Sequence, residues 1–267
     1  MTTQPPLLAT ADPPAYRLCN PEGCAPWVIT ADHAGRAIPH ALGSLGLSAA
    51  DLDRHIAWDI GIAGLAEQLA ERLDAFAIAQ TYSRLVIDCN RAPGTPQSIV
   101  TESERTPIPG NVGISAVEAE TRAAAIFHPY HDRIRAELDA RAAPGRRTLL
   151  VALHSFTPVF LGMSRPWHCG VLYQRDARLG HLLLAIAAVA QRGQSLSTAL
   201  PAQANAVAAR DRPLLHELCY GTLRWYPRLR LLVDSLLAKP LKAADAAGQI
   251  AWAERIARWL EEALPAL

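Results

Sequence analysis

The chain has 267 residues, and half of them (50%) are hydrophobic, which is ample apolar material for a packed core and excludes an intrinsically disordered protein. The formal net charge of +1 excludes an overall electrostatic attraction to nucleic acid or anionic membranes. No run of about 18 uncharged apolar residues occurs, and the amino terminus lacks a signal-peptide pattern. We therefore expect a cytoplasmic protein that does not enter a membrane.

The five cysteines fit a reducing compartment. They are scattered and odd in number, and no CxxC pair occurs. Cys19 and Cys24 lie close enough in sequence to share a metal ion or to form a disulfide, but no second pair completes a zinc ribbon. Both roles for this pair stay open as minor alternatives.

The amino-terminal part of the chain predicts a lead-in, a strand and a helix. Residues 1–26 are rich in proline and predict an irregular segment, which is followed by a buried strand ending at TADHAG with His33. Residues 48–73 begin with a helix-capping serine and carry apolar residues at helical spacing. They predict one helix that contains Asp59.

Two further strands are predicted at residues 76–80 and 85–89, and the second ends on the segment DCNR. A loop rich in proline and glycine follows at 92–113. Loops of this length inside a domain often carry function.

The remaining elements of the first part complete an alternating pattern. A helix is predicted at 115–140, a strand at 148–153 that leads into His154, and another strand at 169–173. Strands that alternate with helices indicate an α/β fold with a mainly parallel sheet and helices on both faces. We assign this fold to residues 27–181.

Three predicted strands end on side chains that can hold a metal ion or a carboxylate. These side chains are His33, the pair Asn90 and Arg91, and His154. In open α/β sheets, ligands bind where the strands end. Each histidine alone is more often structural, but their combination predicts one shared hydrolytic metal site.

The character of the chain changes after residue 181. Residues 182–244 hold eight Lys or Arg against three Asp or Glu, and they predict helices without a strand. This segment is either a solvated basic face or a surface for RNA. Residues 245–267 predict an amphipathic helix that packs on the α/β domain.

Several motifs resemble the N-formylglutamate amidohydrolase family. They are VITADHAGRAIP, HIAWDIG, YSRLVIDCNR, HPYH, VALHSF and CGVLYQRD, in the family's order, and QIAWAERIARWLEEAL is similar to its last helix. The resemblance implies a fold similar to the zinc carboxypeptidases, which are phosphorylase/hydrolase-like. It also implies hydrolysis of N-acyl acidic amino acids in amino-acid degradation, with N-formyl-L-glutamate converted to formate and glutamate.

The resemblance also implies roles for individual residues. The metal ion, Zn²⁺ or another divalent transition metal, would be held by His33, Asp59 and His154, with Asp32 as the alternative third ligand. Arg84, Asn90 and Arg91 would bind the substrate carboxylates, because guanidinium groups bind carboxylates through two parallel hydrogen bonds. For the two arginines, a structural ion pair with Asp88 or with an acidic residue of a loop is the alternative. His131 would orient the substrate or stabilise the oxyanion, and a packing role on its helix is the alternative.

The middle segment has a different resemblance. QRGQSLSTALPA and RDRPLLHELCYGTLRWYPRLRLLVDSLLAKPL are similar to the NusB-like amino-terminal domain of bacterial rRNA cytosine-5 methyltransferases. The histidine and glutamate that the amidohydrolase family carries before its last helix have no match here, so reduced turnover is expected. The alternative is a non-catalytic chimeric protein whose basic helices bind RNA, and a third is a recombined chain whose helical segment has no function of its own.

Overall fold

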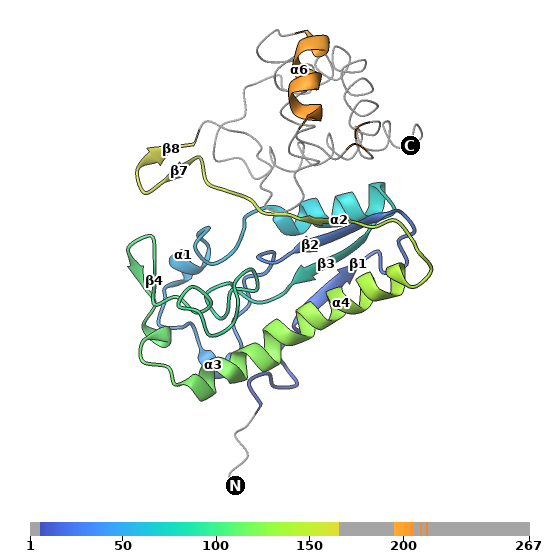
Figure 1. Cartoon of the computed structure of the whole chain (residues 1–267). Helices are drawn as coiled ribbons and strands as arrows, with labels where there is room; N and C mark the ends of the chain where they lie inside the picture. The colour runs from blue at the N-terminus through green and yellow to red at the C-terminus, as the bar shows by residue number, and fades with distance from the viewer. Residues whose placement is uncertain (1–5, 166–194, 206–208, 210–211, 213–267) are drawn as a thin grey trace. The chain divides into compact units, whose positions relative to one another are not determined.

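A computed structural model of the chain describes residues 6–165, 195–205, 209 and 212 (Figure 1). The chain divides into two compact units, one with residues 1–164 and 244–257, the other with 165–243 and 258–267. In the first unit a four-stranded sheet is combined with helices, which makes it a mixed α/β structure.

The sheet of the first unit has the strand order β1-β3-β2-β6. β2 (Trp27–Ala31) runs parallel to both β3 (Phe76–Gln80) and β6 (Leu149–Ala152), whereas β1 (Tyr16–Cys19) is antiparallel to β3. All residues of β3 are buried, as its apolar sequence FAIAQ requires in the middle of a sheet. Because β2 and β6 are parallel neighbours, the residues that follow them lie at the same edge of the sheet.

β1 corrects the expectation that residues 1–26 are irregular. This strand lies at the edge of the sheet, and its two central residues are exposed. A short edge strand needs little apolar sequence, because one side of it is not covered by a neighbouring strand. The proline-rich sequence around it gave no signal for this strand, all four residues of which pair with β3.

The helix predicted at residues 48–73 is two helices separated by turns. α1 (Ala49–Leu52) is one turn long, and α2 (Ile62–Arg72) begins after Gly61, whose φ of 85° is in the left-handed region. Glycine adopts this conformation without the steric cost that a side chain would add. Asp59 consequently lies in the connecting loop and not inside a helix, which corrects the sequence-based expectation.

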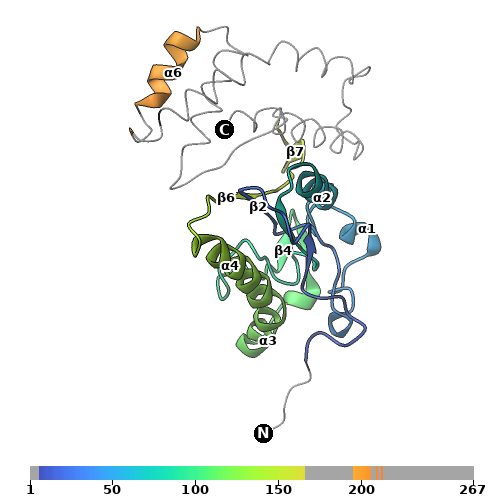
Figure 2. The same ribbon diagram turned by 90° about the vertical axis from the view of Figure 1, so that its right-hand side faces the viewer.

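Helices lie on both sides of the sheet in the first unit. Figure 1 and Figure 2 show α2 on one side and α4 (His128–Ala142) on the other. α2 buries an apolar stripe that contacts β1, β2 and β3. The stripe consists of Ile62, Ala66, Leu69 and Ala70.

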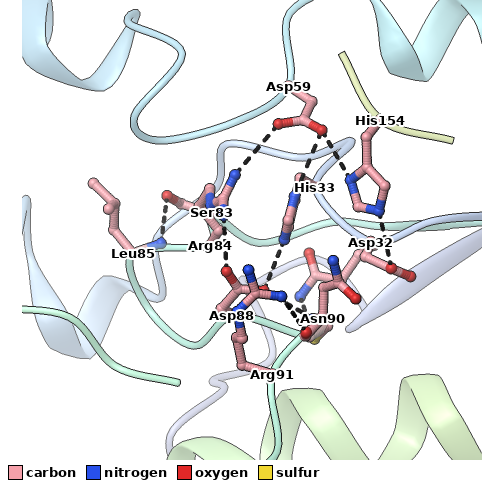
Figure 3. A network of polar contacts seen from close by, with 12 residues as sticks. Asp32, His33, Asp59, Ser83, Arg84, Leu85, Asp88, Asn90, Arg91 and His154 are labelled. Atoms are coloured by element: carbon pink, nitrogen blue, oxygen red, sulfur yellow. Dashed lines mark hydrogen bonds and ion pairs between the residues drawn. The ribbon is translucent and has the colours of Figure 1, made fainter. Parts of the chain in front are cut away.

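The predicted strand at 85–89 is wrong, because these residues form turns. They are buried without pairing as a strand: the amide of Val86 donates to the carbonyl of Ser83, and the amide of Asp88 donates to the carbonyl of Ser98. A short apolar run predicts burial, and burial alone does not distinguish a strand from a packed turn. The turn delivers Arg84, Asp88 and the residues after them to the edge of the sheet (Figure 3).

The loop predicted at 92–113 contains two short strands, β4 (Glu102–Ser103) and β5 (Thr106–Pro107), followed by the 3-10 helix η2 (Pro109–Asn111). Another 3-10 helix, η1 (His40–Leu42), precedes α1. These elements cover the core below the sheet edge, where Leu45, Ile108 and Leu85 are among the buried residues.

The helix predicted at 115–140 is confirmed as a continuous helical segment. It comprises α3 (Ala116–Arg122), the π-helical turn η3 (Ala123–Phe127) and α4. Ser115 and Glu118 form a reciprocal capping box at its start. A π-helical turn adds a residue and changes the direction of the side chains that follow it, which include Tyr130 and His131.

The strand predicted at 148–153 is confirmed as β6. A hairpin of β7 (Val159–Phe160) and β8 (Met163–Ser164) follows in the first unit. In the second unit, the described helix α6 (Leu196–Ala204) begins at the capping residue Ser195.

Three predictions lie outside the described residues: the strand at 169–173, most of the helical segment 182–244, and the last helix. Within the described parts of the chain, no helix combines the length and the apolar character needed to cross a bilayer.

Candidate metal centre

The parallel strands β2 and β6 bring two histidines together. His33 follows β2 and is 2% exposed, and His154 follows β6. The ladder between the strands continues to the edge, because the amide of Leu153 donates to the carbonyl of Thr30 at 2.8 Å. The centres of the two imidazole rings lie 4.9 Å apart, at an interplanar angle of 56°.

Asp59 lies between the two imidazoles (Figure 3). Its Oδ2 atom is 3.1 Å from Nδ1 of His154 and 3.5 Å from Nδ1 of His33, and it also accepts a hydrogen bond from the amide of Ser155. The amide of Asp59 donates to the carbonyl of His33 at 2.9 Å, which fixes the loop against the end of β2. One ligand atom from each of the three side chains lies within 4.8 Å of the others.

A second carboxylate lies behind each imidazole. Nε2 of His33 is 2.7 Å from Oδ1 of Asp88, and Nε2 of His154 is 3.6 Å from Oδ2 of Asp32. The amide of Asn90 donates to Oδ1 of Asp88 at 2.8 Å and holds this carboxylate in place. Both imidazoles therefore face Asp59 with Nδ1 and an outer carboxylate with Nε2.

Arg84 connects two of these carboxylates. Its Nη2 atom donates to Oδ2 of Asp88 at 2.9 Å, and its Nη1 atom lies 3.5 Å from Oδ1 of Asp59. The sequence suggested that Arg84 holds a substrate carboxylate, and that role stays a prediction. In this structure its guanidinium group pairs with the carboxylates beside His33.

The donor set fits a divalent cation. Three carboxylates, those of Asp32, Asp59 and Asp88, are at most 7% exposed, and Arg84 pairs with two of them. Burying this excess of negative charge is costly unless a further cation offsets it. Nδ1 of His33 is buried without a hydrogen-bond partner among the described residues, so its position suits a metal ligand.

The pKa shifts agree with a site that favours positive charge. Burial opposes protonation of His33, but the carboxylates of Asp59 and Asp88 outweigh it and raise its pKa. Burial also opposes ionisation of Asp59, but its contacts with His154 and His33, together with the charge of Arg84, lower its pKa. In Asp88 the bond from His33 likewise outweighs burial and lowers the pKa. Both carboxylates are therefore ionised at neutral pH, as metal ligands and their partners must be.

The other predicted site residues lie along the turn after Asp88 and on α4. Asn90 and Arg91 are exposed, and Nη1 of Arg91 donates to the carbonyl of Asn90 at 2.8 Å. His131 packs its ring on Phe127 at 4.2 Å, and its Nε2 atom lies 2.8 Å from the carbonyl of Cys89. His131 thus supports the backbone that precedes Asn90, and its catalytic role stays a prediction.

Two residues of the site were not proposed from the sequence. Asp88 ends the apolar run of YSRLVIDCNR, where an acidic residue at the end of a buried segment was the available signal. Tyr130 lies in HPYH beside His131, and its hydroxyl donates to Oδ1 of Asp32 at 2.7 Å. Nothing in the sequence around Tyr130 distinguishes it from a core aromatic residue.

The comparisons with known proteins agree with the resemblance seen in the motifs. The model of the family described as N-formylglutamate amidohydrolase matches residues 25–207. The fold is also similar to that of the gene product Atu2144 from Agrobacterium tumefaciens, with a TM-score of 0.73 and 30% sequence identity. That similarity covers 97% of this chain and 98% of the Agrobacterium protein.

A second set of relatives matches a short part of the chain. The ribosomal RNA small subunit methyltransferase B of Pseudomonas putida is 55% identical over 62 residues, and that of Vibrio vulnificus is 52% identical over 54 residues. These matches cover 23% and 20% of this chain. The chain spans only 14% and 13% of the length of these relatives.

Proposed function

Because this chain belongs to the N-formylglutamate amidohydrolase family, we propose that it is a metal-dependent hydrolase of N-acyl amino acids. We assign N-formyl-L-glutamate as the substrate and formate and glutamate as the products. The observation that carries the proposal is the convergence of His33, Asp59 and His154 within 4.8 Å, with Nδ1 of His33 buried and without a hydrogen bond among the described residues.

The residues around the site have distinct tasks in this proposal. A divalent ion such as Zn²⁺, held by His33, Asp59 and His154, would polarise a carbonyl and lower the pKa of a water molecule to about 7. Asp88 would accept a hydrogen bond from the N–H at Nε2 of His33, which leaves the Nδ1 lone pair for the ligand position. Arg84 holds the carboxylates of Asp59 and Asp88 in fixed orientations.

The substrate would be oriented by its carboxylates. N-formyl-L-glutamate carries two of them, and Arg91 with Asn90 is exposed on the turn directly after Asp88. A guanidinium group can bind one carboxylate through two parallel hydrogen bonds. We assign this contact to Arg91, with Asn90 as its neighbour and Arg84 as a second candidate.

The direct test is formate release from N-formyl-L-glutamate by the purified full-length protein. We expect activity that is lost after treatment with a chelator and restored by Zn²⁺. In His154→Ala, metal binding and formate release should both fall to background. The matched control is His128→Ala, because His128 is a half-exposed histidine on α4 that pairs with Glu120 and does not contact the site.

The expected turnover is modest. The proton-transfer glutamate of the family has no counterpart in the sequence motifs, and such groups contribute about 100- to 10,000-fold to rate. Metal binding by the unchanged protein and its loss in His154→Ala would support the site even at low turnover. If the protein binds no divalent metal and releases no formate, the proposal is wrong.

A second candidate function rests on the short match to the methyltransferases. In this alternative the protein is a non-catalytic chimera, and the basic segment 182–244 binds RNA. Neutralising Arg224, Arg228 and Arg230 together should then weaken RNA binding and flatten its salt dependence. The matched control neutralises three exposed arginines of the first unit, Arg17, Arg36 and Arg135. Equal RNA binding by the two triple variants, or no binding at low salt, would contradict this alternative.

A further inference from the structure

The two imidazoles of the site differ in how firmly their outer faces are held. The side chain of His33 is 2% exposed and bonds Asp88 at 2.7 Å, whereas that of His154 is 32% exposed. Nε2 of His154 lies 3.6 Å from Oδ2 of Asp32, which is an ion-pair distance and longer than a hydrogen bond. Because His154 lies on a loop and its side chain is partly exposed, an outer partner at Nε2 would restrict the orientation of its ring.

A tyrosine on α4 holds the carboxylate of Asp32 in place. The hydroxyl of Tyr130 donates to Oδ1 of Asp32 at 2.7 Å, and both residues are buried. Tyr130 lies in the first turn of α4, directly after the π-helical turn that changes the direction of the helix side chains. One carboxylate therefore receives the phenol from α4 with one oxygen and faces His154 with the other.

We propose that Asp32, held by Tyr130, is a positioning residue for His154. When a metal ion takes the lone pair of Nδ1, the proton of the neutral imidazole lies on Nε2, and Asp32 is the carboxylate that faces this N–H. A neutral imidazole has one N–H and one acceptor nitrogen, so the partner of one nitrogen decides which nitrogen can bind a metal. The inference rests on the proposed function, because it concerns the same site.

The assignment also decides between the two candidates for the third metal ligand, Asp59 and Asp32. Asp59 faces Nδ1 of both imidazoles, whereas Asp32 faces the opposite nitrogen of His154 and is occupied by Tyr130. We therefore assign Asp59 as the metal ligand and Asp32 as the outer partner of the ligand His154.

The test is titration of the metal-free full-length protein with Co²⁺, followed through the visible absorption of the bound ion. The test variants are Asp32→Asn and Tyr130→Phe. The first removes the charge at nearly constant shape, and the second removes a single oxygen. We expect each to weaken Co²⁺ binding about 10- to 100-fold, as removal of an outer partner of a metal-binding histidine commonly does.

Two variants serve as matched controls. Asp12→Asn changes an aspartate that also pairs with a histidine, His40 at 2.6 Å, and Tyr82→Phe changes a buried tyrosine whose hydroxyl donates to the carbonyl of Pro13. Both should bind Co²⁺ as tightly as the unchanged protein. Thermal unfolding followed by circular dichroism identifies any variant that fails to fold, and the single-oxygen change in Tyr130→Phe keeps the test valid if Asp32→Asn does not fold.

The outcomes separate this inference from the proposed function. Equal Co²⁺ affinity in Tyr130→Phe, Tyr82→Phe and the unchanged protein overturns the role of Asp32 and Tyr130 and leaves the metal site standing. Absence of Co²⁺ binding by the unchanged protein overturns both. Loss of affinity confined to Asp32→Asn and Tyr130→Phe, with the site spectrum of the controls unchanged, supports the positioning role.

Discussion

Two of the buried polar clusters among the described residues of the first unit are built in opposite ways. The metal-site cluster gathers Asp32, Asp59 and Asp88 around two imidazoles and Arg84, and it leaves Nδ1 of His33 without a hydrogen-bond partner among the described residues. The other, which we call the Arg122 cluster, consists of Arg122 and Asn111 with the backbone carbonyls that they bond.

The Arg122 cluster is saturated with hydrogen bonds. The guanidinium of Arg122 donates to Oδ1 of Asn111 at 2.6 Å and to the carbonyls of Val86 and Gly110, and the amide of Asn111 donates to the carbonyls of Leu85 and Val100. Complete pairing of this kind is what a buried structural network requires. The metal-site cluster instead combines excess negative charge with a buried ring nitrogen, Nδ1 of His33, that makes no hydrogen bond among the described residues, which suits the binding of a cation.

The two clusters meet on one turn. The carbonyls of Leu85 and Val86, which the Arg122 cluster bonds, lie between Arg84 and Asp88 of the metal-site cluster. The saturated network therefore holds the backbone that positions the unsaturated one. The comparison shows that burial alone does not indicate the role of a polar group. Complete hydrogen bonding indicates a structural role, whereas a missing hydrogen bond indicates a candidate ligand.

The largest expected effect is loss of metal binding on removal of a ligand. In His33→Ala, the affinity for Co²⁺ or Zn²⁺ should fall by more than about 100-fold, because loss of a ligand exceeds the effect of losing its outer partner. Isothermal titration calorimetry measures the change. Affinity within a few-fold of the unchanged protein would remove His33 from the ligand set.

A change in the Arg122 cluster should act on stability. Arg122→Met leaves Oδ1 of Asn111 and two carbonyls without their donor, and we expect the free energy of unfolding to fall by about 3 kcal/mol. Urea denaturation measures it, and saturating Zn²⁺ should restore part of the loss because the ion binds only the folded protein. A loss below about 1 kcal/mol would show that water replaces the guanidinium.

The pH dependence of stability that arises from His33 should disappear when the metal is bound. In metal-free protein the raised pKa of His33 stabilises the fold below its ordinary value of 6.5, and this contribution is lost as the pH rises through the raised value. Metal binding requires the neutral ring, so the affinity should rise over the same interval. Thermal unfolding with and without Zn²⁺, across this interval, measures both slopes. Parallel slopes in the two states would contradict the coupling.

The smallest expected effect concerns the helix that carries Arg122. Ser115→Ala removes the hydroxyl of the capping box at the start of α3 and should cost about 1 kcal/mol of stability. Metal affinity should not change, because the cap is remote from the site in the hydrogen-bond network. The prediction would be contradicted if Ser115→Ala weakened Co²⁺ binding by more than its loss of stability accounts for. That result would show that the start of α3 is coupled energetically to the metal site.

Several elements of the fold were predicted correctly because the sequence pattern of each element reflects a local physical requirement of that element. The apolar runs at 27–31, 76–80 and 149–152 are strands, although most residues of the last one are exposed, and the capping serine at 115 begins a helix. These signals are local, because an apolar run or a helix cap is recognised from residues that are neighbours in the sequence. The turn at 85–89 was misread for the same reason, because its apolar residues indicate burial and carry no information about which backbone groups they bond.

The sequence by itself determined which side chains stand at the ends of the apolar runs, and it predicted His33, His154 and Asp59 as the ligands of a metal site. Only the tertiary structure decided that Asp59 leaves the helix to lie between the two imidazoles, that Arg84 pairs with carboxylates, and that Asp88 and Asp32 lie behind the histidines. These contacts join residues that are up to 122 positions apart, as in the pair of Asp32 and His154. The physical reason is that the hydrogen bonds of a cap or a turn form between residues a few positions apart. The partners of a charged side chain depend instead on how whole strands and helices pack against one another.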